Sequence, residues 1–188
     1  MLHHLKEYGK YLEITGYRNV KFASTEGFLK AHRKQTTEKV DIQFFDAELI
    51  ATQEHLFFAV INALEAFKNK RNISKSPAME TMLYASAQRQ IKKAILKCGI
   101  KPSTTNVAAI IIGENQTQLR TAVEAISIAV DAEPDDSVLE MSNLKDSKIR
   151  RVFQILDEEV IAVVKGRNIQ EALVNLVVER VALLTTQL

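Results

Sequence analysis

Cysteine is nearly absent from this sequence, and the single Cys98 limits the chemistry that the chain can support. One cysteine cannot form an intrachain disulfide, and it cannot supply the several thiolates of a structural zinc site. Cys98 also falls on the core side of an expected helix end, where a small buried hydrophobe is a commoner role than a catalytic nucleophile.

Glycine-rich phosphate-binding motifs and long apolar runs are missing as well. The six glycines are scattered singly, so neither G-x-x-x-x-G-K-[ST] nor G-x-G-x-x-G occurs. No apolar run approaches the roughly 20 residues that a membrane-spanning helix needs. The beginning of the sequence holds no apolar segment of signal-peptide length. We therefore expect a cytoplasmic protein with no membrane contact.

Histidines and acids show no catalytic arrangement. The four histidines lack the spacing of a metal site, and a structural role for His55 is favoured over one as a general base. The acids at 135–136 and 157–159 are interpreted as solvated loop residues. We expect no catalytic residue, no cofactor and no metal.

Hydrophobic periodicity places strands and helices along one domain. The 188 residues are enough for one well-buried core, and no linker divides them. Strands are expected at 11–17, 40–45 and 106–113, the last of which is a continuous apolar run typical of a central strand. Helices are expected at 26–35, 52–70, 76–98, 118–130, 142–155 and from 168 onward.

The second and third of these helices carry the clearest end signals. Thr52 can cap the first of them. Ser76 followed by Pro77 is typical of an N-cap and a first helical position. Gly99 is expected to end this helix in the left-handed conformation, which makes residues 76–98 one continuous helix.

The last helix is more apolar than one buried face requires. Asn168 to Glu171 has the form of a capping box, although the many valines leave a strand possible for part of the segment. Val174, Val178 and Leu183 lie outside the main apolar stripe. Exposed apolar residues on a terminal helix commonly mark an interface, so these three are the expected partner-binding residues. The alternative is that they cover the sheet.

Charge is balanced overall but unevenly distributed. The net charge is +2, yet residues 67–113 hold nine basic residues and one acid, whereas residues 114–140 hold seven acids and one arginine. Such asymmetry can steer a polyanion to one side of a protein. Two complementary solvated faces would give the same pattern.

An unusual string, Glu-x-x-x-Tyr-Ala-Ser-x-x-Arg-Gln-Ile, occupies residues 80–91. It is accompanied by His55-Leu56, Asn72-Ile73-Ser74, Gly99-Ile100 and the segment 178–184. Together these resemble the PRPK-binding protein family, the small subunit of the KEOPS (EKC) complex. Two features depart from the pattern: Ala87 stands where glycine is common, and residues 1–39 are longer than the usual beginning.

The resemblance implies an α/β (α+β) fold, one compact domain over residues 1–188 with a mixed β-sheet flanked by helices. Residues 1–39 would form an extended N-terminal element. The resemblance also implies a non-catalytic subunit that binds and activates the kinase-like ATPase subunit of KEOPS. Such a subunit holds the 3′ CCA end of tRNA while the transferase subunit makes threonylcarbamoyladenosine (t6A).

Carried onto this sequence, the resemblance and the basic central segment give a set of expected RNA contacts. These are Lys70, Arg71, Asn72, Ser74, Lys75, Arg89, Gln90 and Lys93. Lysine and arginine would meet phosphates, and the uncharged side chains could contact base edges or ribose hydroxyls. Asn72 and Ser74 could instead satisfy backbone groups in a turn.

Two other functions stay open at this point. The chain could be an interaction module that binds the kinase subunit without direct RNA contact. An unrecognised small-molecule enzyme is the weakest of the three hypotheses.

Overall fold

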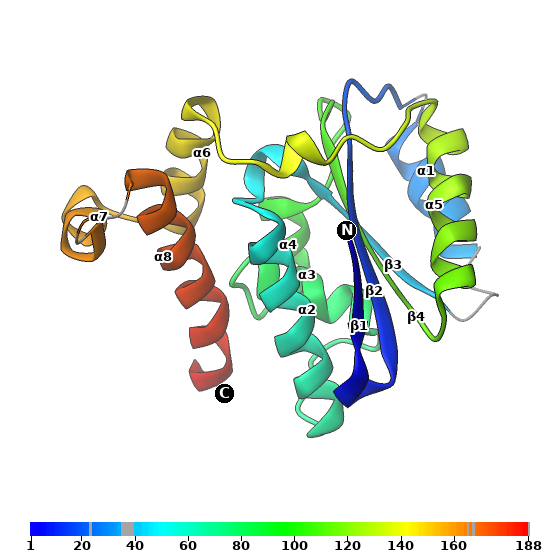
Figure 1. Ribbon diagram of the computed structural model, residues 1–188, viewed down its shortest axis with the longest axis horizontal. Coiled ribbons are helices and arrows are strands. Elements are labelled where there is room, and N and C mark those ends of the chain that lie inside the picture. Colours follow the sequence, from blue (N-terminus) through cyan, green and yellow to red (C-terminus); the bar gives the residue numbers. More distant parts are fainter. Residues whose placement is uncertain (23, 35–39, 165, 167, 188) are drawn as a thin grey trace.

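A four-stranded sheet forms the centre of the molecule in a computed structural model that describes residues 1–22, 24–34, 40–164, 166 and 168–187 (Figure 1). The strand order is β1-β2-β4-β3. The strands are β1 (Leu2–Leu5), β2 (Lys10–Tyr17), β3 (Asp41–Asp46) and β4 (Val107–Gly113). The α/β (α+β) fold is confirmed, but the expected mixed sheet is wrong in one respect. All three pairings are antiparallel: β1 and β2 form a hairpin, and β4 enters between β2 and β3 and runs against both.

Helices cover both faces of this sheet. One face carries α1 (Thr25–Lys34) and α5 (Gln116–Val130); the other carries α2 (Gln53–Lys68), α3 (Pro77–Ala85) and α4 (Ile91–Cys98) (Figure 1). Beyond α2 lie α6 (Asn143–Phe153), α7 (Asp157–Val164) and α8 (Ile169–Leu183). Short 3-10 helices occupy Lys6–Tyr8, Ala47–Leu49, Asp136–Leu139 and Leu184–Gln187. Among the described residues, no helix has the length and apolar character to cross a membrane.

The position of β4 inside the sheet explains why its sequence is apolar at every position. Successive side chains of a strand point to opposite faces of the sheet. Ala108, Ile110 and Ile112 therefore join the core under α2 and α3. Val107, Ala109 and Ile111 join the core under α1 and α5. A strand covered on both faces shows no polar alternation, so the predicted central position is confirmed.

Local capping signals also predicted helix starts well. The side chains of Thr52, Ser76, Ser142 and Asn168 each accept a hydrogen bond from the first turn of the helix that follows. The last segment is helix throughout α8, so the strand alternative is excluded. The expected helix at 26–35 is α1, and its last residue, Gln35, lies outside the described part of the chain.

The expected continuous helix over 76–98 is wrong. It ends at Ala85, and α4 begins six residues later. The amide of Gln88 donates to the carbonyl of Leu83, and the amide of Ala87 donates to the carbonyl of Tyr84, each at 2.9 Å. Ala87 has φ +49°. This is a Schellman turn with alanine at the left-handed position, where glycine is usual.

Three further expectations need correction. Gly99 is extended (φ −74°, ψ 157°) rather than left-handed. Glycine is required there because an added Cβ would lie 2.6 Å from the carbonyl oxygen of Ile95. The acids at 157–159 form the first turn of α7 instead of a loop, where negative charge stabilises the helix dipole. Strand β1 was not anticipated, and it pairs with β2 as a hairpin.

The left-handed alanine gives a stability prediction. Ala87→Gly should raise the free energy of unfolding by about 0.5–1 kcal/mol. A left-handed residue with a Cβ costs about 1–2 kcal/mol, and glycine loses about 0.5–1 kcal/mol more backbone entropy on folding. Urea unfolding measures the difference. Ala129→Gly, on the exposed face of α5, is the matched control and should destabilise by about 1 kcal/mol. Destabilisation by Ala87→Gly would contradict the assigned turn.

Candidate functional site

The loop between α2 and α3 is held by hydrogen bonds to a buried carboxylate. Glu80, on α3, is 1% exposed. Its carboxylate oxygens accept the backbone amide of Ile73 at 3.1 Å and that of Ser74 at 2.7 Å. Hydrogen bonds from backbone amides to an ionised acceptor are among the stronger ones in proteins. The loop conformation therefore depends on Glu80.

Two expected RNA contacts in this loop have structural roles. Ser74 is 3% exposed, and its hydroxyl donates inward to the carbonyl of Ser76 at 2.9 Å. The amide group of Asn72 donates to the carbonyl of Ser74 at 2.9 Å. The expectation that Ser74 faces RNA is thus contradicted by its burial, and the turn-forming alternative holds for both side chains.

The cations of the same loop do point to solvent. Lys70, Arg71 and Lys75 are all exposed. Lys70 has φ +55° and occupies a second Schellman turn, in which the amide of Arg71 donates to the carbonyl of Ala66 at 2.8 Å. These three side chains form the first basic group.

The second basic group, which consists of two cations and Gln90, follows the turn at Ala87. Arg89, Gln90 and Lys93 are all exposed at the start of α4. Gln90 is the N-cap residue of α4, yet its side chain does not make the capping hydrogen bond. Its exposed amide is therefore not used in capping the helix.

The two basic groups lie on either side of α3 in the chain. The first group precedes this helix of nine residues and the second follows it. At about 1.5 Å per residue, the helix alone spans roughly 13 Å. Each group is therefore described by itself.

A cavity lies at the turn that leads into the second group, although none of Arg89, Gln90 and Lys93 lines it. The cavity has a volume of about 290 Å³ and lies where the turn after α3 meets α4, α6 and α8. The ammonium of Lys97 stands 4.5 Å from the ring centroid of Phe153, and burial lowers the pKa of Lys97. Arg180 enters from α8 and pairs with Glu159. The polar lining is completed by Gln88 and Gln154.

Sequence reasoning missed several of these lining residues. Lys97 lies one helical turn after Lys93, which was a usable signal. Arg180 interrupts the apolar pattern of the last helix, and a cation at such a position indicates a polar pocket or an ion pair. Phe153 and Gln154 come from a different helix, and no local pattern connects them to α4.

His55 has a structural role at the centre of this region. It is fully buried, and its Nδ1 accepts the backbone amide of Ala51 at 3.2 Å. Nε2 must then carry the proton and donate to the carbonyl of Ala85 at 2.8 Å. Burial lowers the pKa of His55 from 6.5 to about 4. Its imidazole also meets the edge of Phe153.

The cysteine that was considered as a nucleophile is buried as well. Cys98 is fully buried, and burial raises the pKa of its thiol to about 12, which keeps it protonated. Within the described ranges, no group of three or more histidine, cysteine, aspartate and glutamate side chains could hold a metal ion.

The expected partner surface on α8 needs revision. Val174 is 7% exposed and Val178 is half-buried, and both pack into the core formed by α6, α7 and α8. The expectation of an exposed apolar patch is wrong for Val174, whereas Leu183 is 40% exposed and lines the cavity. Leu156 and Ile161 are apolar residues with a larger exposed fraction than Leu183. Leu156 directly precedes α7 and Ile161 lies on it, and this helix was not predicted.

The buried carboxylate gives the second prediction. Glu80→Gln should lower the free energy of unfolding by about 1–3 kcal/mol, because the amide that replaces one oxygen is a donor and faces backbone N–H groups. Hydrogen exchange at the amides of Ile73 and Ser74 should accelerate. Glu54→Gln, an exposed acid on α2, should change stability by less than about 0.5 kcal/mol. Unchanged exchange at both amides would show that Glu80 does not hold the loop.

The buried imidazole gives a pH prediction. Because the folded pKa of His55 lies below its unfolded value of 6.5, the unfolded state binds more protons at acid pH. The free energy of unfolding should fall by about 2 kcal/mol from pH 7.5 to pH 5 through this residue. His55→Gln keeps one donor and one acceptor, and it should be less stable at pH 7.5 but lose this pH dependence. Equal pH slopes for the two proteins in urea unfolding would contradict the assignment.

Comparisons with known proteins identify the family of the chain. A family model described as "Kinase binding protein CGI-121" matches residues 17–185. The chain is also 38% identical to the regulatory protein Cgi121 of Methanocaldococcus jannaschii over 113 residues. That match covers 60% of this chain and 70% of the relative. The chain therefore belongs to the CGI-121 kinase binding protein family.

Proposed function

We propose that this protein is a non-catalytic, cytoplasmic subunit of the KEOPS complex, which makes t6A in tRNA. In this role it binds and helps to activate the kinase-like ATPase subunit and holds the 3′ CCA end of tRNA. Membership of a kinase-binding family supports the first part. The related archaeal protein is named a regulatory protein.

The RNA part of the proposal rests on one observation, the cavity beside the second basic group. A volume of about 290 Å³ suits one unstacked base rather than a duplex. Arg89 follows the lining residue Gln88 in the chain, and Lys93 precedes the lining residue Lys97 by about one helical turn; both are exposed and would meet phosphates. The amides of Gln88 and Gln154 can hydrogen-bond the edges of a base. Such a combination favours an unpaired RNA end, whose bases can be splayed out.

Phe153 and Lys97 give this cavity a lining that is partly apolar and partly charged. The apolar ring lies beneath the lysine ammonium, and the lysine stem is half-buried against it. The ring is only 4% exposed, so the lysine ammonium is the group that this part of the cavity offers to a phosphate. The remaining expected contacts, Lys70, Arg71 and Lys75, lie beyond the far end of α3 and would reach only a more distant part of the tRNA.

The kinase-facing surface is proposed at α7 and the end of α8. Leu156, Ile161 and Leu183 are exposed apolar residues of this region, and such residues in a group commonly mark a protein interface. They replace Val174, which is buried. Val178 remains at the half-buried margin of this surface.

A second candidate function is kinase binding without direct RNA contact. It is favoured by the lining of the cavity, which includes none of Arg89, Gln90 and Lys93. Under this alternative the exposed lysines would only solvate the surface.

Titration with tRNA distinguishes the two functions. Arg89→Ala and Lys93→Ala should each weaken binding of intact tRNA by roughly fivefold to tenfold, or about 1–1.4 kcal/mol. Each should also reduce the slope of log affinity against log salt by about 0.7 for a single strand. Lys21→Ala, an exposed lysine on the β2–α1 connection, is the matched control and should leave affinity unchanged.

The same titration with tRNA that lacks its CCA end gives the decisive comparison. Under the proposal the trimmed tRNA binds weakly, and the two variants no longer differ from the unmodified protein. Equal affinity for intact and trimmed tRNA, or no affinity for either, would leave kinase binding alone as the function.

A further inference from the structure

Strand β1 forms one edge of the sheet. It stands first in the strand order, and β2 is its only neighbouring strand among the described residues (Figure 1). The outer side of an edge strand presents backbone N–H and C=O groups with which another strand can pair. The proposed function does not use β1, because the candidate RNA cavity and the apolar residues of α7 and α8 lie on other elements.

The hydrogen bonds of the hairpin show which backbone groups of β1 point outward. Met1 and Ile14 form a hydrogen-bonded pair: the amide of Ile14 donates to the carbonyl of Met1 at 3.1 Å, and the amino group of Met1 donates to the carbonyl of Ile14. Such pairs recur at every second residue of an antiparallel ladder. His3 therefore bonds to β2, whereas the amides and carbonyls of Leu2 and His4 point to the outer edge.

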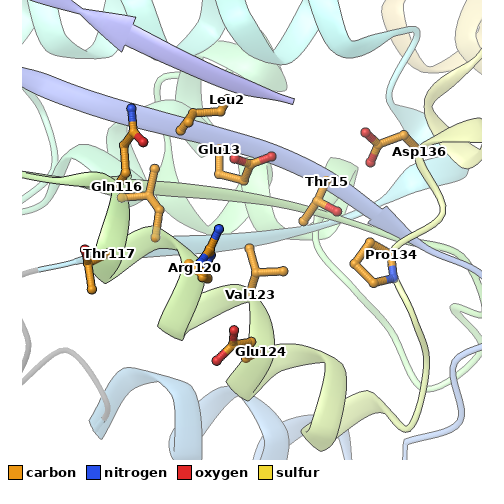
Figure 2. A pocket seen from close by; sticks show the side chains of 11 residues that line it. Leu2, Glu13, Thr15, Gln116, Thr117, Arg120, Val123, Glu124, Pro134 and Asp136 are labelled. Atoms are coloured by element: carbon orange, nitrogen blue, oxygen red, sulfur yellow. The ribbon is translucent and has the colours of Figure 1, made fainter.

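The side chains of β1 leave this edge open to association. The strand contains no proline, lysine, arginine or acid, which are the residues that commonly protect an edge. Leu2 is 44% exposed and lies on the α5 side of the sheet beside Glu13, where it lines an open groove (Figure 2). On the α2 side, a hollow of about 320 Å³ lies beside Met1 and His3. An uncharged edge of this kind favours pairing with another strand.

We propose that β1 pairs with β1 of a second copy of this chain, which joins two four-stranded sheets into one continuous sheet. A two-fold axis perpendicular to the sheet makes the two strands antiparallel and keeps each face on its own side. The register centred on His3 uses every outward group. Leu2 of each copy then lies opposite His4 of the other, which gives four backbone hydrogen bonds. His3 lies opposite its own counterpart, next to the hollow on the α2 side.

Charge complementarity supports a second copy as the partner. Lys6 directly follows β1 and is exposed, and in this register it lies next to Met1 of the second copy. The ammonium of Met1 is 2.7 Å from a carboxylate oxygen of Glu13 and 3.5 Å from one of Asp136. The two acids exceed this ammonium by one negative charge, and Lys6 of the other copy supplies the opposite charge. By symmetry the contact occurs at both ends of the paired strands.

Sedimentation of the purified chain tests the pairing. Four backbone hydrogen bonds and a small contact area predict a weak dimer, with a dissociation constant of roughly 10–100 μM. The average mass should rise from 21.2 kDa towards twice that value as the concentration increases.

His4→Pro locates the contact. It removes one outward N–H from each copy, and it should weaken association about tenfold or more. The monomer should keep its fold, because proline is tolerated on an edge strand where the N–H does not bond to the neighbouring strand. His4→Ala is the matched control. It loses the same stacking of His4 on Tyr11 but keeps the N–H, and it should weaken association less than about twofold.

Cysteine substitution tests the register. The Cα atoms of the two His3 residues would lie about 4.5 Å apart, which suits a disulfide. His3→Cys should therefore form a disulfide-linked dimer under mild oxidation, whereas the native Cys98 is buried and should not react. The Cα atoms of the two His4 residues would lie about 8 Å apart, which is too far for a disulfide. His4→Cys is therefore the control and should stay unlinked.

Three outcomes would overturn the proposal. The first is a chain that stays monomeric well above the expected dissociation constant, which would leave this edge to a strand of another protein. The second is a His4→Pro variant that associates as well as the unmodified chain, which would place the contact elsewhere. The third is a disulfide in His4→Cys instead of His3→Cys. None of these outcomes bears on the proposed function, because neither residue lines the candidate RNA cavity or lies on α7 or α8.

Discussion

The buried imidazole of His55 is the contact on which the arrangement of the helices depends. It holds the chain entering α2 through Ala51 and the last turn of α3 through Ala85, and its ring meets Phe153 of α6. One neutral side chain thus connects the helices on the sheet with those at the C-terminal end. The turn at Ala87 starts where this contact fixes α3, so the direction of α4 and the mouth of the cavity follow from it. A fully paired buried polar group of this kind specifies one packing arrangement.

Glu80 fixes the loop before α3, and His55 fixes the turn after it. Its carboxylate organises the loop that presents Lys70 and Lys75, while His55 organises the turn that precedes Arg89. Both residues belong to the sequence pattern that carries the family resemblance, yet neither is placed where it could contact a ligand. This part of the family pattern therefore records the framework that carries the two groups of exposed polar side chains.

Features set by neighbouring residues could be predicted from the sequence, and features set by distant ones could not. The caps at Thr52 and Ser76 need only three residues, and the burial of β4 is evident from its continuous apolar run. The break at Ala87 was hidden because alanine favours helices, although its replacement of a common glycine marked the left-handed position. The cavity could not be predicted, because Phe153 and Arg180 reach it from other helices.

The central claim is that the turn between α3 and α4, with the adjoining cavity, receives the unpaired end of tRNA. Hydrogen–deuterium exchange of the chain with intact tRNA and with tRNA lacking its CCA end tests it most directly. The account predicts that intact tRNA protects residues 86–97, that trimmed tRNA does not, and that the 69–76 loop changes less. Protection of residues 86–97 by both tRNAs alike, or by neither, would contradict it.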